Sequence, residues 1–85
     1  MKSVRSQDMH HTVAFDRIIR TEIQHKEYNC WLVVAIIEQD RVVIMGRYPT
    51  EKDAIIADTR MWLSEESTYM YPVHVHKMND PDGES

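Results

Sequence analysis

Residues 30–45 read CWLVVAIIEQDRVVIM, and this stretch decides the fold. Two runs of apolar, mostly β-branched residues, 30–37 and 42–45, flank a polar segment that begins at Glu38. Such runs, separated by a short polar turn, are typical of a β-hairpin, which we expect to turn around Gln39 and Asp40. The first strand is apolar on both of its alternating faces, so we expect it to be central in the sheet and covered on both sides.

Residues 13–25 precede the hairpin and fit two secondary structures. As a helix they place several apolar side chains on one broad face, but Glu22 falls in the middle of that face. As a strand they alternate, with Thr21 and Ile23 on one side and Glu22 and Gln24 on the other. This period of two is typical of a half-buried strand, and we favour a strand over residues 17–24.

Residues 51–64 are typical of a helix that begins at a capping residue. Thr50 is a favourable N-cap, and the carboxylate of Asp53 in the first turn opposes the positive end of the helix dipole. On a helical wheel, Ile55 and Trp62 belong to an arc of large side chains, from which we expect Trp62 to lie in the core. A second arc carries the smaller side chains, which are Ala54, Ala57 and Met61.

Residues 69–76 alternate again and predict a last strand, which Pro72 restricts to an edge because proline has no N–H to donate. The predicted class is α+β in the order β-β-β-α-β: an antiparallel three-stranded meander, one packed helix and a C-terminal edge strand. If residues 13–25 are helical, the order is α-β-β-α-β. We expect residues 1–12 to be a flexible tail, 13–77 a single domain and 78–85 an acidic flexible tail.

The chain has 85 residues and a formal net charge of −4, a size that fits one domain. Asp80, Asp82 and Glu84 lie in the last eight residues, so the remainder is nearly neutral and strong attraction to nucleic acid is not expected. The single cysteine, Cys30, cannot form an internal disulfide, and no stretch approaches the roughly 20 apolar residues of a membrane helix. These features predict a cytoplasmic protein that makes no membrane contact.

Motifs for catalysis are missing from the sequence, and we expect neither enzyme activity nor a cofactor. His74 and His76 would lie on one face of a strand and could supply two ligands to Zn²⁺, but the sequence specifies no third ligand, so a metal site is only a weak alternative. Asp58 lies on the predicted helix and could be a buried acid paired with Arg41 or Arg47, or a general base. No motif marks a nucleophile or a metal beside it, so we favour a structural or solvent-facing residue.

One helix covers only one face of the predicted sheet, so its second apolar face needs another cover. A second copy of the chain or a partner protein would provide it, and we predict a non-enzymatic accessory or regulatory protein-binding module that forms a homodimer. Small acidic proteins without catalytic motifs include phage-encoded inhibitors of bacterial protein complexes, and we count such an inhibitor as one form that this module can take. The side chains expected at the partner-binding surface are Trp31, Val33, Arg41, Arg47, Tyr69 and Tyr71.

Residues 31–36 and 42–57, WLVVAI and VVIMGRYPTEKDAIIA, also suggest a known architecture. Their order of strand, turn, strand, cap and helix resembles the three-strand-plus-helix DNA-binding domains of plant ethylene-response factors and the arm-binding domains of phage integrases. The resemblance implies DNA binding by basic and aromatic groups on a sheet face, here Trp31 and four arginines, Arg17, Arg20, Arg41 and Arg47. Strand 30–37 has no Arg or Lys, so nucleic-acid binding is the alternative function and protein binding the favoured one.

Overall fold

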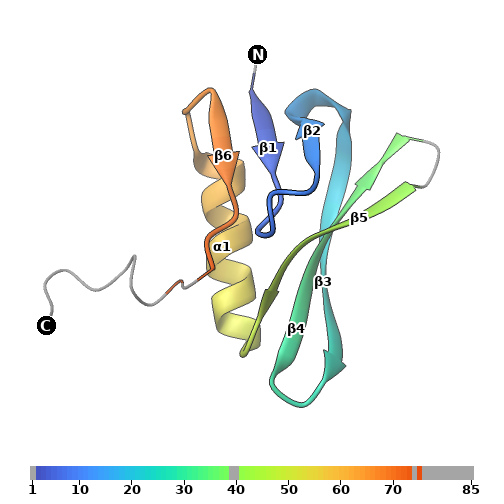
Figure 1. Ribbon diagram of the computed structural model, residues 1–85, viewed down its shortest axis with the longest axis vertical. Coiled ribbons are helices and arrows are strands. Elements are labelled where there is room, and N and C mark those ends of the chain that lie inside the picture. Colours follow the sequence, from blue (N-terminus) through green and yellow to red (C-terminus); the bar gives the residue numbers. More distant parts are fainter. Residues whose placement is uncertain (1, 39–40, 74, 76–85) are drawn as a thin grey trace, which may run out of the picture.

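The computed structural model describes residues 2–38, 41–73 and 75. These residues form two three-stranded sheets and one α-helix (Figure 1). The elements are β1 (Ser3–Arg5), β2 (Thr12–Ala14), the 3-10 turn η1 (Phe15–Arg17), β3 (Ile18–Glu27), β4 (Cys30–Ile37), β5 (Arg41–Tyr48), α1 (Glu51–Leu63) and β6 (Thr68–Met70). One sheet has the order β3-β4-β5, and we call it the meander; the other has the order β2-β1-β6, and we call it the small sheet.

The meander confirms the predicted three antiparallel strands. β3 is a strand and not a helix, and β4 pairs with β3 on one side and β5 on the other. β3 and β4 are joined at Asn29, whose φ of 60° is a left-handed conformation that asparagine tolerates better than most residues. The expected turn residues of the β4–β5 hairpin, Gln39 and Asp40, lie outside the described part of the chain.

The helix begins as predicted, because the hydroxyl of Thr50 accepts a hydrogen bond from the backbone N–H of Asp53 at 3.1 Å. Its buried side, however, is the arc of smaller side chains, and Ala54 and Ala57 are both fully buried. Small side chains let a helix approach a sheet closely, which moves the larger arc to the periphery. The expectation that Trp62 lies in the core is wrong, since it remains 39% exposed.

The small sheet corrects a second expectation, that residues 1–12 form a flexible tail. β1 lies between β2, with which it pairs antiparallel, and β6, with which it pairs parallel. Val4 at its centre is fully buried opposite Val13 and Tyr69. Strands of three residues are too short to show a period of two in the sequence. Their pairing partners are also distant along the chain, so no local pattern predicts them.

The last strand is shorter than the predicted 69–76 and belongs to the other sheet. β6 ends at Met70, two residues before Pro72, and it is an edge strand of the small sheet instead of a fourth strand of the meander. The predicted edge position is confirmed, although Pro72 lies outside the strand and is not the cause of that position. His74, His76 and the acidic segment 78–85 lie outside the described residues.

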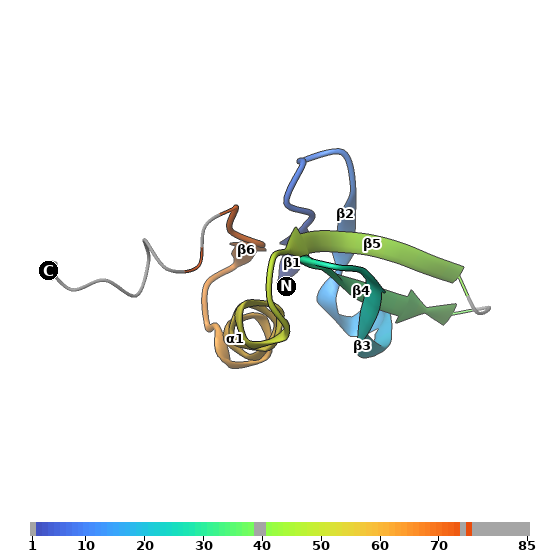
Figure 2. The ribbon, with the colours of Figure 1, turned by 90° about the horizontal axis from the view of Figure 1, so that it is seen from below.

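The main core lies on one face of the meander. There β4 and β5 side chains join residues from the small sheet and from the helix in one buried cluster, which includes Val4, Val13, Val33, Ala35, Met45, Ala57 and Met61. Figure 2 shows the helix and the small sheet gathered beside the meander, with the end of the β4–β5 hairpin extending away from them. This arrangement leaves the other face of the meander without a covering element among the described residues.

Two local features connect the small sheet and β5. The side chain of Gln7 bonds both backbone groups of Arg47, accepting from its N–H and donating to its carbonyl, each at 3.1 Å. The backbone N–H of Gln7 donates to the carbonyl of Met45 at 2.7 Å. Gly46 lies between these positions, and a Cβ there would be 2.8 Å from Cε2 of Tyr48, so the tyrosine ring lies where only glycine leaves space.

Candidate functional site: the open face of the meander

The uncovered face of the meander is built by the register of its strands. Val34 on β4 lies between Glu22 on β3 and Ile44 on β5, and Ile36 lies between Arg20 and Val42. Opposite residues of an antiparallel pair point to the same face. We define the open face as the apolar side chains of this set and their neighbours along β4: Cys30, Leu32, Val34, Ile36, Val42 and Ile44.

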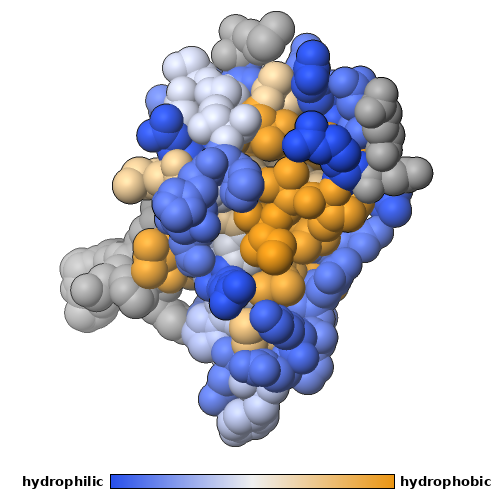
Figure 3. Space-filling view, turned by 45° about the vertical axis from the view of Figure 1, so that its right-hand side comes forward, coloured by the Kyte–Doolittle hydropathy of each residue, from blue (hydrophilic) through white to orange (hydrophobic). Residues whose placement is uncertain are grey.

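Exposure is uneven across the open face. Val34 on the central strand is only 1% exposed, because side chains of both neighbouring strands flank it. Val42 and Ile44 on the edge strand β5 are 59% and 43% exposed. Figure 3 shows an apolar patch framed by hydrophilic side chains on the side of the molecule where the meander lies. The apolar atoms of this face that reach solvent are therefore concentrated along β5.

Polar side chains of β3 form one border of the open face. Nε of Arg20 donates to Oε2 of Glu22 at 3.0 Å, and Nε2 of Gln24 donates to its other oxygen at 3.4 Å. The hydrogen bond from Arg20, followed by that from Gln24, lowers the pKa of Glu22 below its usual value. Arg47 lies opposite Leu32 near the other border. The open face is thus apolar at its centre and carries both signs of charge at its borders.

The structure separates the side chains predicted for partner binding. Val33 and Tyr71 are fully buried in the main core, so their prediction as partner contacts is wrong. Val33 lies on the face of β4 that is covered, one residue out of phase with the open face. Trp31 is half-buried on the same covered side and stacks on His25 with ring centroids 4.2 Å apart. Tyr69 is half-buried, and its hydroxyl donates to the carbonyl of Ala57 at 2.8 Å.

Asp58 takes part in a hydrogen-bonded network and not in the predicted pair with an arginine. Its two carboxylate oxygens accept from the hydroxyl of Thr21 at 2.7 Å and from that of Tyr71 at 2.9 Å. Nε1 of Trp62 donates in turn to the hydroxyl of Thr21 at 2.9 Å. The network ties the helix to β3 and to the segment after β6, which supports the structural interpretation of this aspartate.

Three tyrosine hydroxyls are held in the interior on the covered side. Burial, assisted by the nearby Asp58 carboxylate, raises the pKa of Tyr71 far above its usual value. Burial likewise raises the pKa of Tyr48, whose hydroxyl donates to the carbonyl of Pro72 at 2.7 Å. Burial raises the pKa of Tyr69 to about 12. All three hydroxyls act as hydrogen-bond donors in the neutral form.

The arginines required by the alternative function do not form one surface. Arg20 and Arg47 border the open face, whereas Arg17 and Arg41 line a separate groove between β2 and β5. Arg20 is also paired with Glu22, which reduces its charge toward a phosphate backbone. The three-strand-plus-helix order implied by the resemblance is present, but the meander face has an apolar centre where a DNA-binding sheet needs basic groups.

Other kinds of site gain no support from the described residues. Within 2–38, 41–73 and 75, no three His, Cys, Asp or Glu residues gather as metal ligands, and the predicted pair His74 and His76 lies outside that set. None of the helices in the described part of the chain has the length and apolar character needed to cross a bilayer. Comparisons with protein-family models, with curated proteins and with solved structures give no match to the chain.

Sequence reasoning missed Val42 and Ile44, the most exposed residues of the open face. Counting outward from a turn at 39–40 places residue 42 opposite Ile37, whereas the structure pairs Val42 with Ile36. Because a register shift of one residue exchanges the two faces of a strand, the expected turn would assign Val42 and Ile44 to the covered face.

Proposed function

We propose that this protein is a non-enzymatic protein-binding module, an accessory or regulatory protein that associates with a second copy of itself through the open face. The observation that supports the proposal is an apolar sheet face, centred on Val34 and Ile44, with no covering element among the described residues. Antiparallel sheets that face water usually present polar side chains on that side. An apolar centre is typical of a sheet that packs on another sheet.

The dimensions of the open face predict the strength of the association. Its apolar side chains lie on two strands about 4.8 Å apart, over about six residues of each, and give roughly 200 Å² per protomer, below the largest functional patches on small monomers. Two such faces bury roughly 400 Å² at the centre of the contact, less than the about 1,200 Å² of stable interfaces. We therefore expect a weak dimer that dissociates on dilution.

A second copy suits this face because its border is mixed in charge. Arg20 and Glu22 neutralise each other on β3, so two identical faces can approach without the repulsion that borders of one sign would produce. Isologous packing of identical faces is also the commonest form of self-association. An acidic or basic partner would instead require a border of the opposite sign, which the open face does not have.

The test is the mass in solution by light scattering, at two protein and two salt concentrations. We expect a mass that rises toward the dimer with concentration and changes little with salt, because the contact is apolar. Ile44→Glu should give a monomer at all concentrations. Ile55→Glu is the matched control, since Ile55 is 47% exposed on the helix and lies outside the open face.

Circular dichroism of both variants verifies that they are folded. A wild-type protein that stays monomeric at the highest concentration would contradict self-association. A dimer that survives Ile44→Glu, or one abolished equally by Ile55→Glu, would exclude the open face as its contact surface.

A further inference from the structure

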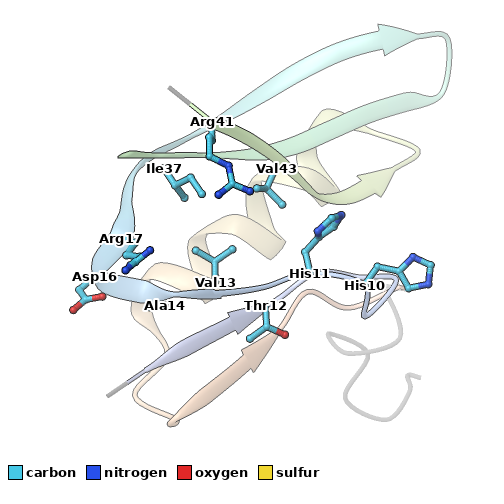
Figure 4. A pocket seen from close by; sticks show the side chains of 10 residues that line it. All are labelled: His10, His11, Thr12, Val13, Ala14, Asp16, Arg17, Ile37, Arg41 and Val43. Atoms are coloured by element: carbon cyan, nitrogen blue, oxygen red, sulfur yellow. The ribbon is translucent and has the colours of Figure 1, made fainter. Parts of the chain in front are cut away.

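A groove of about 770 Å³ lies between β2 with η1 and the start of β5 (Figure 4). It opens where the small sheet and the meander diverge, at the end opposite to the connection made by Gln7. The side chains of His11 and Val13 point toward β5, and those of Ile37, Val43 and Arg41 point toward β2. The groove is therefore enclosed by two elements that the fold brings together but does not pack tightly.

The floor of the groove is apolar. Val13 and Ile37 are 9% and 7% exposed and belong to the main core, and Val43 is half-buried against it. Their remaining exposed atoms line the groove. The volume lies within the range of about 300–1,000 Å³ that is typical of small-ligand sites, whose walls are mainly apolar with a few polar groups that fix orientation.

The described residues that line the groove carry two positive charges and one negative charge, although the chain as a whole has a net charge of −4. Arg17 and Arg41 both line it, and Asp16, the one acidic side chain that the described residues contribute to the lining, points away from it. Arg17 lies 3.5 Å from Glu38, in a pair whose side chains are more than half exposed and thus weakly bound. Arg41 makes no ion pair with any other described residue, so its guanidinium is available to an anion.

We propose that this groove binds a carboxylate joined to a short apolar body. A guanidinium presents parallel N–H donors that match the two oxygens of a carboxylate, and Arg41 would provide this contact with Arg17 beside it. The apolar body would lie on Val13, Ile37 and Val43. The site is separate from the open face, because Arg41 lies opposite Ile37 on the other side of the meander from Ile44.

Titration with hexanoate, followed by the backbone amide signals in NMR spectra, tests the proposal. We expect saturable shifts in the millimolar range for residues 12–17, Arg41 and Val43, and none for Leu32, Val34 and Ile44 of the open face. Hexanol has the apolar body without the charge, and acetate has the charge without the body; at matched ionic strength each should bind at least about tenfold more weakly. Equal shifts with hexanol, or no shifts with hexanoate, would overturn the proposal.

The matched pair of variants is Arg41→Gln and Arg47→Gln. Both arginines are exposed on β5, but only Arg41 lines this groove. Arg41→Gln should weaken hexanoate binding about tenfold, the loss of roughly one charge-assisted hydrogen bond, while Arg47→Gln leaves it unchanged. Equal weakening by both variants would show a general charge effect and reject the groove as the site.

The carboxylate could belong to a small aliphatic acid or to the C-terminus of a peptide that ends in an apolar residue. A tetrapeptide with a C-terminal leucine, in its free-acid and amidated forms, distinguishes these sources. Binding of the free acid that is tighter than that of hexanoate and lost on amidation identifies a peptide end. Binding no tighter than that of hexanoate identifies a small acid, and binding of the amidated form equal to that of the free acid contradicts recognition of the carboxylate.

Discussion

The two faces of β4 have the same apolar character and different surroundings. On one face Val33 and Ala35 are fully buried under the small sheet and α1, in the main core. On the other, Leu32 and Val34 form a separate cluster with Ile36 and adjoin exposed side chains of β5. The continuous apolar run of β4 therefore identifies a strand that is apolar on both faces. The run itself does not indicate which of these faces the rest of the chain covers.

The largest expected effect on stability comes from introducing a charged side chain on each of the two faces in turn. Val33→Glu would place a carboxylate in the main core, and we expect a loss of at least about 4 kcal/mol in the free energy of unfolding, enough to unfold much of a small domain. Ile44→Glu, on the open face, should change that free energy by less than about 1 kcal/mol, because its side chain is 43% exposed. Urea denaturation of both variants measures the difference.

Similar losses of unfolding free energy for the two variants would contradict the difference in burial between the two faces. A large loss for Ile44→Glu would mean that the open face is covered in the folded monomer. A folded Val33→Glu variant would mean that Val33 is not in the core. Val33→Glu is thus no test of dimerisation, whereas Ile44→Glu is.

The next effect belongs to the covered side alone and appears at high pH. The ordinary tyrosine pKa is 10.0, and that of Tyr69 is raised to about 12 in the folded protein, while those of Tyr48 and Tyr71 are also raised. The unfolded chain then loses these protons first, so stability is fully present below about pH 10 and falls as the pH rises through 12.

The measurement combines absorbance at 295 nm, which detects tyrosinate, with circular dichroism across this pH range. We expect part of the tyrosinate signal to appear together with the loss of secondary structure. Tyr71→Phe removes one of the groups and should make the alkaline transition less steep. Full ionisation of all tyrosines in a protein that keeps its native spectrum would contradict the interior placement of these hydroxyls.

The smallest effect concerns the connection that holds the small sheet over the covered face. Gln7→Ala removes the two hydrogen bonds to the backbone of Arg47 and one to the carbonyl of Pro72. We expect a loss of about 1–2 kcal/mol, since the exposed groups can bond to water instead. Hydrogen exchange of the Arg47 amide should accelerate, and that of Val34 should change much less.

Gln24→Ala is the control, because this glutamine is exposed on β3 and its side chain bonds to Glu22 alone among the described residues. A loss of stability as large as that of Gln7→Ala would mean that the small sheet is not held through Gln7.

Local patterns predicted much of this fold. The hairpin, the strand before it and the capped helix depend on residues close together in the sequence, such as Thr50 and Asp53, and all three are confirmed. The side of the helix that is buried could not be derived in this way. Ala57 is buried instead of Trp62 because the small sheet and the meander leave space for a close approach only, which is a property of the assembled core.

The sequence predicted the kind of site, an uncovered apolar sheet face, but not most of the residues that form it. That an apolar sheet face would lack a cover follows from one helix and a strand with two apolar faces. Which residues form that face depends on the small sheet, and its strands contain single apolar residues such as Val4 and Val13 that resemble those of a tail. Because the small sheet was not predicted, Val33 was expected at the partner-binding surface in place of Val42 and Ile44.

The position of β1 has a consequence for how the chain folds. This strand is the centre of the small sheet, yet one of its partners, β6, lies 65 residues further along, where Ser3 pairs with Thr68. Closing so long a loop is slow compared with forming the β4–β5 hairpin, whose strands are adjacent. During synthesis the meander can form early, but its covered face cannot be completed until residue 70 has left the ribosome. Until then both faces of β4 are open to other chains, and the nascent protein is most prone to aggregate in that interval.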